Sequence, residues 1–255
     1  MPRSKGIHRH TQFKLGKAPA KHDERTLRFA ILLKAKISLP RQYDFDAQHP
    51  DIPLPMFAND RYGDCVMAGR AHQTLRFELA EQKQLINITD LDVTREYFQE
   101  TGGADTGLIV LDSLRLWRTS GWRIDNTIYK IQAFSELDPK NRDLIKQAIV
   151  LDIGVGLGIG LPLSAQRQFE AGKAWDVVRG PGAAVNSWGG HYVFVPGYTP
   201  TGPVCVTWGR KQQITWRFLE KYCDEAYAII DALDSPSIQN NLHADRVQQF
   251  LDELS

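Results

Sequence analysis

The sequence predicts an α+β fold, in which a helical half precedes a half built on a mostly antiparallel sheet. Apolar residues recur at helical spacing in several segments before about residue 150, whereas short apolar runs separated by turn residues dominate after it. Segregated helices and strands are typical of α+β domains, because regularly alternating segments would favour a parallel sheet. The 255 residues suffice for one large domain or two small ones.

Four helices are expected in the first half. The longest begins at about Cys65, after Asp64 in an N-cap position, and carries apolar residues on one face to about Gln84. Asp138 and Pro139 open the last one, since proline is tolerated at the first helical position. The predicted helical ranges are 65–84, 93–99, 106–119 and 138–150.

The second half contains runs typical of strands. Residues 153–161 alternate glycine with Val, Leu and Ile, which suits a strand that other backbone approaches closely. This run has no Lys-Ser/Thr ending and no suitable following helix, so it is not interpreted as a phosphate loop. Further strands are expected over 191–198, 203–208 and 225–230, with helices over 216–222 and 243–254.

The charge distribution divides the chain into a basic arm and an acidic body. Residues 1–41 carry eleven Lys or Arg against two acidic residues, and the remainder carries twenty basic and twenty-eight acidic residues. The arm, residues 1–38, is either a solvated tail or a docking segment for an acidic surface. That surface could belong to another protein, a larger assembly or the chain's own body. Nucleic acid is not the expected partner, because no motif supports it.

The cysteines and the apolar runs indicate the compartment. Cys65, Cys205 and Cys223 are too few and too scattered for a disulfide framework, so a cytoplasmic or other reducing compartment is expected. No secretory signal peptide is expected at the N-terminus, and no apolar run reaches the ~20 residues of a membrane helix.

No cofactor or metal ion is expected. His8, His10 and His22 lie on the basic arm, where a solvated tail is the simpler interpretation. Cys205 and Cys223 lack the paired spacing of a zinc site.

Cys65 and His191 together form the strongest chemical pattern. A cysteine is a useful nucleophile only when its thiolate is populated, and a helix N-terminus or a neighbouring imidazolium achieves this. Cys65 opens a predicted helix after a glycine-containing loop. His191 follows two glycines and precedes an apolar strand, so a rigid element could present it to a distant cysteine. The pair therefore predicts nucleophilic catalysis with a general base.

Several segments, in order along residues 39–231, resemble the papain-like cysteine peptidase family. Leu-Pro-Arg-Gln-Tyr-Asp-Phe from residue 39 is similar to the mature family N-terminus, and Asn-Asp-Arg-Tyr-Gly-Asp-Cys, ending at Cys65, resembles the nucleophile segment. The family's catalytic-histidine strand is similar to Gly-His-Tyr-Val-Phe-Val-Pro-Gly-Tyr, which starts at residue 190. The segment after the family's orienting Asn is similar to Thr-Trp-Gly, which starts at residue 207. Residues 105–122 resemble the intervening helix.

The resemblance implies a site with named roles. Cys65 takes the place of the nucleophile, His191 of the base and Asn59 of the oxyanion-hole Gln. Val206 falls where the family has its orienting Asn and cannot hold an imidazole, whereas the hydroxyl of Thr207 can if the strand presents it on the right face. An Asn-Ser-Trp-Gly run at 186–189 precedes the histidine and is interpreted as a loop.

The implied catalytic domain covers residues 39–231, with a helical part at about 39–150 and a sheet part at about 151–231. Residues 232–255 form a C-terminal helical tail. The 38 residues before Leu39 are short for an inhibitory pro-domain, so a zymogen is not expected. The first function hypothesis is a thiol hydrolase or acyl transferase acting on peptide or amide bonds of a peptide or protein substrate. The alternative is a catalytically inactive binding or assembly module tethered by its arm.

Overall fold

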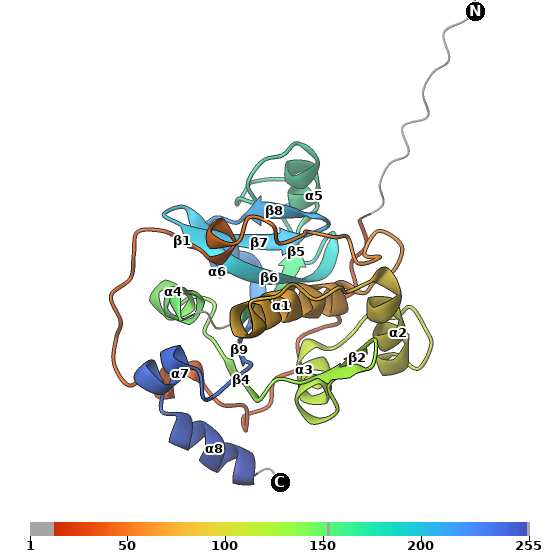
Figure 1. Cartoon of the computed structure of the whole chain (residues 1–255). Helices are drawn as coiled ribbons and strands as arrows, with labels where there is room; N and C mark the ends of the chain where they lie inside the picture. The colour runs from red at the N-terminus through yellow and green to blue at the C-terminus, as the bar shows by residue number, and fades with distance from the viewer. Residues whose placement is uncertain (1–12, 152–153, 254–255) are drawn as a thin grey trace, which may run out of the picture.

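The computed structural model describes residues 13–151 and 154–253 and has the predicted α+β architecture (Figure 1). The helical part precedes the sheet in the chain and packs against one of its faces. It contains helices α1 (Cys65–Gln82), α2 (Asp90–Glu100) and α3 (Val110–Thr119), with a hairpin of β2 (Trp122–Ile124) and β3 (Thr127–Tyr129).

The sheet half is built on seven antiparallel strands in the order β4-β9-β5-β6-β7-β8, with β1 also paired to β6. The strands are β1 (Tyr43–Asp44), β4 (Ala133–Glu136), β5 (Gly154–Leu161), β6 (Gly189–Thr199), β7 (Gly202–Thr207), β8 (Arg210–Gln213) and β9 (Cys223–Ile230). The remaining helical segments are η1 (Phe29–Ile31), η2 (Phe45–Gln48), α4 (Arg142–Val150), α5 (Leu163–Glu170), α6 (Trp216–Tyr222), α7 (Pro236–Asn241) and α8 (Ala244–Glu253).

Most elements with clear patterns are present, and several without them were missed. Helix α4 was predicted to open at Asp138 and Pro139, but it begins at Arg142, because Asn141 caps its N-terminus by accepting from Leu144 N. The predicted strands correspond to β5, β6, β7 and β9. Strand β8 has the sequence Arg-Lys-Gln-Gln and no apolar alternation, because it lies at the sheet edge. Helix α2 begins earlier than predicted, because Thr89 and Asp92 form a capping box at its N-terminus.

Helix α1 lies across the sheet and packs on β6 (Figure 1). A Cβ at Gly69 of α1 would come within 2.6 Å of the Tyr192 ring, so glycine permits this close approach. Tyr192 belongs to the apolar core between α1 and the sheet, whereas Val193 and Val195 belong to the core on the opposite face. The period of two along β6 thus divides its side chains between two cores.

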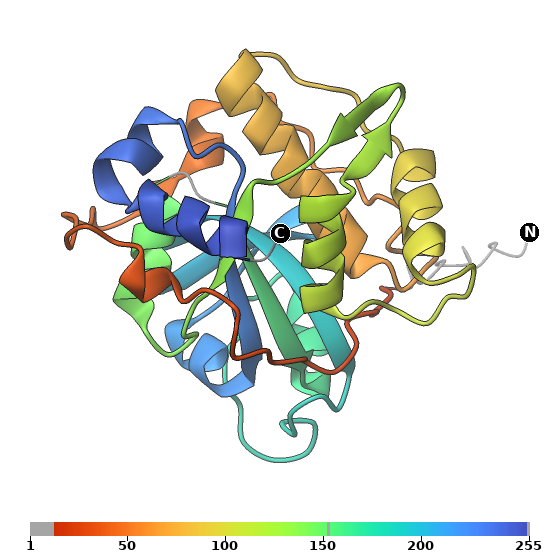
Figure 2. The same ribbon diagram turned by 90° about the horizontal axis from the view of Figure 1, so that it is seen from below.

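Residues 13–38 pack against the body of the same chain. Phe29 and Leu32 are fully buried in the core on the sheet face away from α1. Figure 2 shows this red segment running past the ends of the strands. Docking on the chain's own body was one alternative that the charge division left open. Residues 1–12 of the predicted arm lie outside the described residues, and an external acidic partner stays a prediction.

Within the described residues, no helix combines the length and the apolarity that a membrane crossing requires.

Candidate active site

Cys65 is the first residue of helix α1, as predicted. The loop before it is tight, with Phe57 and Ala58 at positive φ and Asp64 at the N-cap. The first backbone N–H groups of a helix have no acceptors within it, and the helix dipole favours negative charge there. A thiolate or an oxyanion at Cys65 would therefore be stabilised by the helix.

His191 is held by two neighbours from β7 and the turn that follows it. Its Nε2 lies 2.7 Å from Oγ1 of Thr207, and the indole of Trp208 stacks on the imidazole with centroids 4.0 Å apart and planes inclined by 12°. Nδ1 is buried and has no hydrogen-bond partner among the described residues. The ring orientation is thus defined through Nε2, which leaves Nδ1 free to exchange a proton.

A β-bulge in β6 brings Thr207 to the face of His191. Gly197 pairs with Val204, but Phe194 pairs with Val206, so β6 contains one extra residue between these pairs. Pro196 lies in this stretch and has no N–H to donate to the ladder. Without the bulge, the side chain of Thr207 would point to the opposite face. Its placement next to the imidazole follows from this register shift.

The thiol of Cys65 lies against the strand that carries His191. The backbone N–H of Tyr192, the next residue, donates to Sγ of Cys65 at 3.4 Å. Thr207 thus contacts His191, and the Cys65 thiol contacts the backbone of the next residue. Among the described residues, Nδ1 of His191 makes no hydrogen bond with the thiol. Both cysteine and histidine side chains are almost fully buried, at 1% exposure.

Asn59 does not present the free donor that its predicted oxyanion role requires. Its Nδ2 donates to the carbonyl of Tyr62 at 3.1 Å and to Oδ1 of Asp64 at 3.0 Å, which uses both amide hydrogens. Asp64 is fully buried, and this burial raises its pKa to about 8. A buried carboxyl group needs donors, and Asn59 serves that need in this conformation.

Burial keeps the nucleophile and the base neutral in this conformation. It raises the pKa of the Cys65 thiol to about 12, although the N–H groups of Tyr192 and Gly16 oppose this shift by hydrogen bonding. Burial also lowers the pKa of His191 to about 3. A thiolate–imidazolium pair therefore requires that solvent or a substrate first reach the two groups.

The groups that cover the thiol belong to the N-terminal segment 13–18, called here the cleft segment. The backbone N–H of Gly16 acts on the Cys65 thiol, where it opposes the rise in pKa, and the Gly16 carbonyl accepts from Leu108 N at 2.8 Å. The N–H of Lys17 donates to the carbonyl of Gly190 at 3.1 Å. The cleft segment thus bridges the helical half, through Leu108, and the sheet half, through Gly190, which directly precedes His191.

The cleft segment fits because glycines let its backbone approach the backbone of both halves closely. A Cβ on Gly16 would lie 1.6 Å from the carbonyl oxygen of Gly63, and a Cβ on Gly190 would lie 2.1 Å from the carbonyl oxygen of Lys17. The sequence predicted no zymogen, because the residues before Leu39 are short for an inhibitory pro-domain. A few residues suffice to cover the thiol, because main-chain hydrogen bonds and glycine contacts hold them on both sides.

Lys17 anchors the cleft segment by a buried ion pair. Its side chain is 2% exposed, and Nζ lies 3.0 Å from Oδ2 of Asp224 and 3.0 Å from Oε1 of Glu225. Burial acts against the charge of Lys17, but the two carboxylates outweigh it and raise the pKa of the lysine. Glu225 is itself buried, which raises its pKa despite the attraction of Lys17.

Sequence reasoning missed the cleft segment, the acidic pair and the stacking role of Trp208. The pair Asp224-Glu225 stands at the start of a strand, and the basic arm supplied a counter-charge. This charge complementarity was a signal, but the particular lysine could not be chosen, because the arm contains several. Nothing in the sequence places Lys17 beside strand β9.

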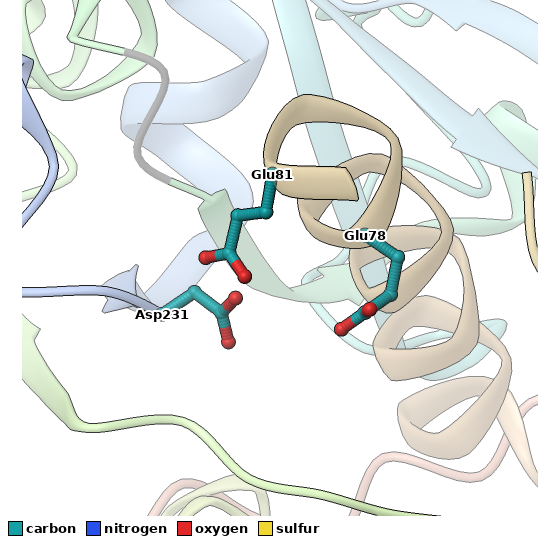
Figure 3. Close-up of side chains that lie close together, drawn as sticks. All are labelled: Glu78, Glu81 and Asp231. Carbon is teal, nitrogen blue, oxygen red and sulfur yellow. The ribbon is translucent and has the colours of Figure 1, made fainter. Parts of the chain in front are cut away.

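Glu78, Glu81 and Asp231 form an acidic cluster away from this site (Figure 3). One carboxylate oxygen of each lies within 4.8 Å of the others. Burial, and then the hydrogen bond with Glu81, raise the pKa of Asp231 to about 9. A proton held between Asp231 and Glu81 explains how the carboxyl groups lie together, so no metal is assigned there.

This cluster predicts a pH dependence of stability. Since the pKa of Asp231 is raised in the folded state, the folded chain binds a proton that the unfolded chain loses from about pH 4 upwards. The free energy of unfolding is therefore expected to fall as the pH rises from about 4 to about 9. Asp231→Asn should reduce this fall in chemical denaturation measurements at several pH values. Asp234→Asn, at an exposed position nearby, is the matched control, and an equal effect of both variants would contradict the assignment.

Solved structures with the same fold are cysteine proteases. Xylellain, a cysteine protease from Xylella fastidiosa, superposes with a TM-score of 0.66 at 16% identity, covering 89% of this chain and 99% of that one. The Carica candamarcensis cysteine protease CMS1MS2 gives 0.57 at 13% identity, over 76% and 99%. Procathepsin B from Trypanosoma congolense gives 0.57 at 13% identity, over 86% and 87%.

These similarities confirm the predicted papain-like fold at low sequence identity, so the chain is a divergent example of it. No protein-family model matches the sequence, and no curated protein does.

Proposed function

We propose that this chain, which has the papain-like fold, is a cysteine peptidase that hydrolyses peptide or amide bonds through Cys65 and His191. The observation that carries the proposal is the arrangement around the histidine. Its Nε2 is hydrogen-bonded to Thr207, its ring is stacked on Trp208, and its Nδ1 has no partner among the described residues. The Cys65 thiol accepts a hydrogen bond from the backbone N–H of the next residue, Tyr192. This arrangement supports a base with a defined orientation.

The proposed reaction begins with proton transfer from Sγ of Cys65 to Nδ1 of His191. The thiolate then attacks the carbonyl carbon of the scissile bond, and the imidazolium protonates the leaving amine as the carbon–nitrogen bond breaks. Water, deprotonated by His191, hydrolyses the resulting thioester and releases the acid. The hydroxyl of Thr207 hydrogen-bonds Nε2 of His191, so Thr207 is a positioning residue that takes the role of the family's orienting Asn.

The oxyanion of the tetrahedral intermediate needs hydrogen-bond donors. The backbone N–H of Cys65, at the N-terminus of α1, is the donor that the helix geometry supports best. Asn59 can add its amide only after releasing Tyr62 or Asp64. The cleft segment also has to leave before a substrate carbonyl reaches the sulfur. We therefore propose that the described conformation is a latent one.

The proposal is tested by covalent trapping. In the full chain carrying Lys17→Met, which removes the buried ion pair, a peptidyl vinyl sulfone should modify Cys65 more than tenfold faster than Cys205 or Cys223, because Cys65 is the cysteine that the proposed base His191 serves. Peptide mapping by mass spectrometry locates the adduct. The same variant should hydrolyse a peptide-amide library, and adding Cys65→Ala should abolish this. Equal modification of all three cysteines would contradict the proposal.

A second candidate, an inactive binding module, is favoured by one observation. Both amide hydrogens of Asn59 are occupied, which leaves the oxyanion site without its predicted side-chain donor. In that case Cys65 could still be trapped, but no member of the library would be hydrolysed. The two readouts of the same experiment therefore separate the peptidase from the module.

A further inference from the structure

A cavity of about 230 Å³ lies where the helical half meets the edge of the sheet. It is placed between the last turn of α3 and the C-terminal end of α8, beside the edge strand β4 (Figure 2). Residues 25–27 also line it. None of its described lining residues belongs to the candidate active site, so the cavity is a separate site.

Much of the cavity wall is apolar. Ala133 of β4 is 1% exposed, and its small side chain leaves space that a larger residue would fill. Phe134 of β4 and Phe250 of α8 add half-buried rings, and Leu27 adds a half-buried aliphatic side chain. A ligand with an apolar body would gain free energy by removing this surface from water. The two rings favour an aromatic body, because aromatic rings pack edge to face.

The polar part of the wall is cationic. Arg25, Arg115 and Arg118 line the cavity, and no acidic side chain is among the lining residues that the structure describes. Arg25 and Arg115 both donate to the carboxylate of Asp23. Arg118 has no hydrogen-bond or ion-pair partner in the described part of the chain. One guanidinium at the cavity is therefore without a counter-charge.

The helix end accounts for a cation at this position but not for the cavity. Arg118 lies in the last turn of α3, where the helix dipole favours positive charge, yet such a cation needs no apolar recess beside it. One unpaired guanidinium offers two parallel N–H donors, which fit the two oxygens of one carboxylate. A phosphate would need further donors, and Arg25 and Arg115 already serve Asp23.

The volume of the cavity sets the size of the ligand. Since a cavity of about 150 Å³ holds benzene, this one holds a ring with a short alkyl stem. We propose that the cavity binds a small aryl-alkyl carboxylate, with Arg118 pairing with its carboxylate and with Phe134 and Phe250 packing on its ring. This site does not depend on the proposed peptidase function, because the two share no lining residue.

Chemical-shift titration of the full chain, labelled with nitrogen-15, tests the site. 4-Phenylbutyrate should shift the amide signals of Thr119, Ala133 and Phe250 and should bind about tenfold more tightly than the neutral 4-phenylbutanamide, because only the carboxylate accepts charge-assisted hydrogen bonds. Arg118→Gln should bring the two affinities together. Arg123→Gln, at an exposed position of β2 outside the cavity, is the matched control and should leave the ratio unchanged.

Phe250→Ala tests the apolar part of the site separately. It removes a ring and keeps Arg118, so it should weaken the acid and the amide by similar factors of about fivefold. Phe250 is half-buried near the end of the chain, so its replacement is tolerated by the fold. Equal affinities of acid and amide for the unmodified chain, no saturable shifts, or shifts confined to other parts of the molecule would overturn the proposal.

Discussion

Replacing Lys17 by methionine is expected to raise the rate at which iodoacetamide alkylates Cys65 by about 100-fold at pH 7.5. Breaking a buried ion pair by removing one partner typically costs 3–5 kcal/mol, and 1.36 kcal/mol corresponds to a tenfold change in population. The Lys17 pair is of this kind, because the lysine and Glu225 are 2% and 1% exposed. The variant should therefore populate the open cleft far more often, and alkylation follows that population.

The chain offers a matched control in Lys21→Met. Lys21 lies in the same N-terminal stretch and also pairs with a carboxylate, Asp112, but the two side chains are 48% and 40% exposed. Exposed ion pairs contribute about 0–1 kcal/mol to the free energy of unfolding, so Cys65 in this variant should be alkylated at close to the wild-type rate. Both variants lose one positive charge and gain the same side chain. Equal acceleration by the two would show that net charge, and not the buried pair, controls access to the thiol.

Removing His191 in the Lys17→Met chain is expected to slow alkylation of Cys65 at pH 6 by about 100-fold. In the open cleft, the imidazolium and the helix N-terminus should keep the thiol largely ionised at this pH. Without the histidine, the pKa should return toward ~8.5, which leaves under one per cent thiolate at pH 6. The loss should shrink as the pH approaches 9, so the pH profile distinguishes a lost ion pair from a damaged fold.

His72 provides the control for this experiment. It is also a buried histidine, at 3% exposure, and it lies on the same helix as Cys65, packed against Phe57. His72→Ala creates a comparable cavity but should leave the pH profile of Cys65 alkylation unchanged. Thr207→Val, which removes only the bond to Nε2, should give a smaller loss than His191→Ala. If His191→Ala leaves the pH profile of Cys65 alkylation unchanged, His191 is excluded as the base.

The sequence alone predicted the parts of the site that depend on local structure. Cys65 was placed at a helix N-terminus because a loop with Asp64 at the N-cap position precedes an amphipathic run, and the structure begins α1 at that residue. His191 was placed on an apolar strand, and it is the third residue of β6. These features follow from capping and periodicity, which neighbouring residues specify.

The contacts of Thr207 and Asn59 were beyond prediction from sequence. Whether Thr207 faces the histidine depends on the pairing register of β6 and β7, and one extra residue in β6 reverses the face. Asn59 has the chemistry of an oxyanion donor, but a buried Asp64 takes its amide. In both cases the outcome depends on which partners tertiary packing supplies.

By itself, then, the sequence determined an α+β chain with a cysteine opening a helix and a distant histidine on a strand, because helical and strand periods are local properties. Only the tertiary structure decided that the N-terminal residues cover the thiol and that Lys17 is the buried cation. The basic arm contains several lysines, and their charges are equivalent in the unfolded chain. The one that pairs with Glu225 is selected by glycine contacts at Gly16 and by main-chain hydrogen bonds on both sides of the cleft, which exist only after the two halves of the fold have come together.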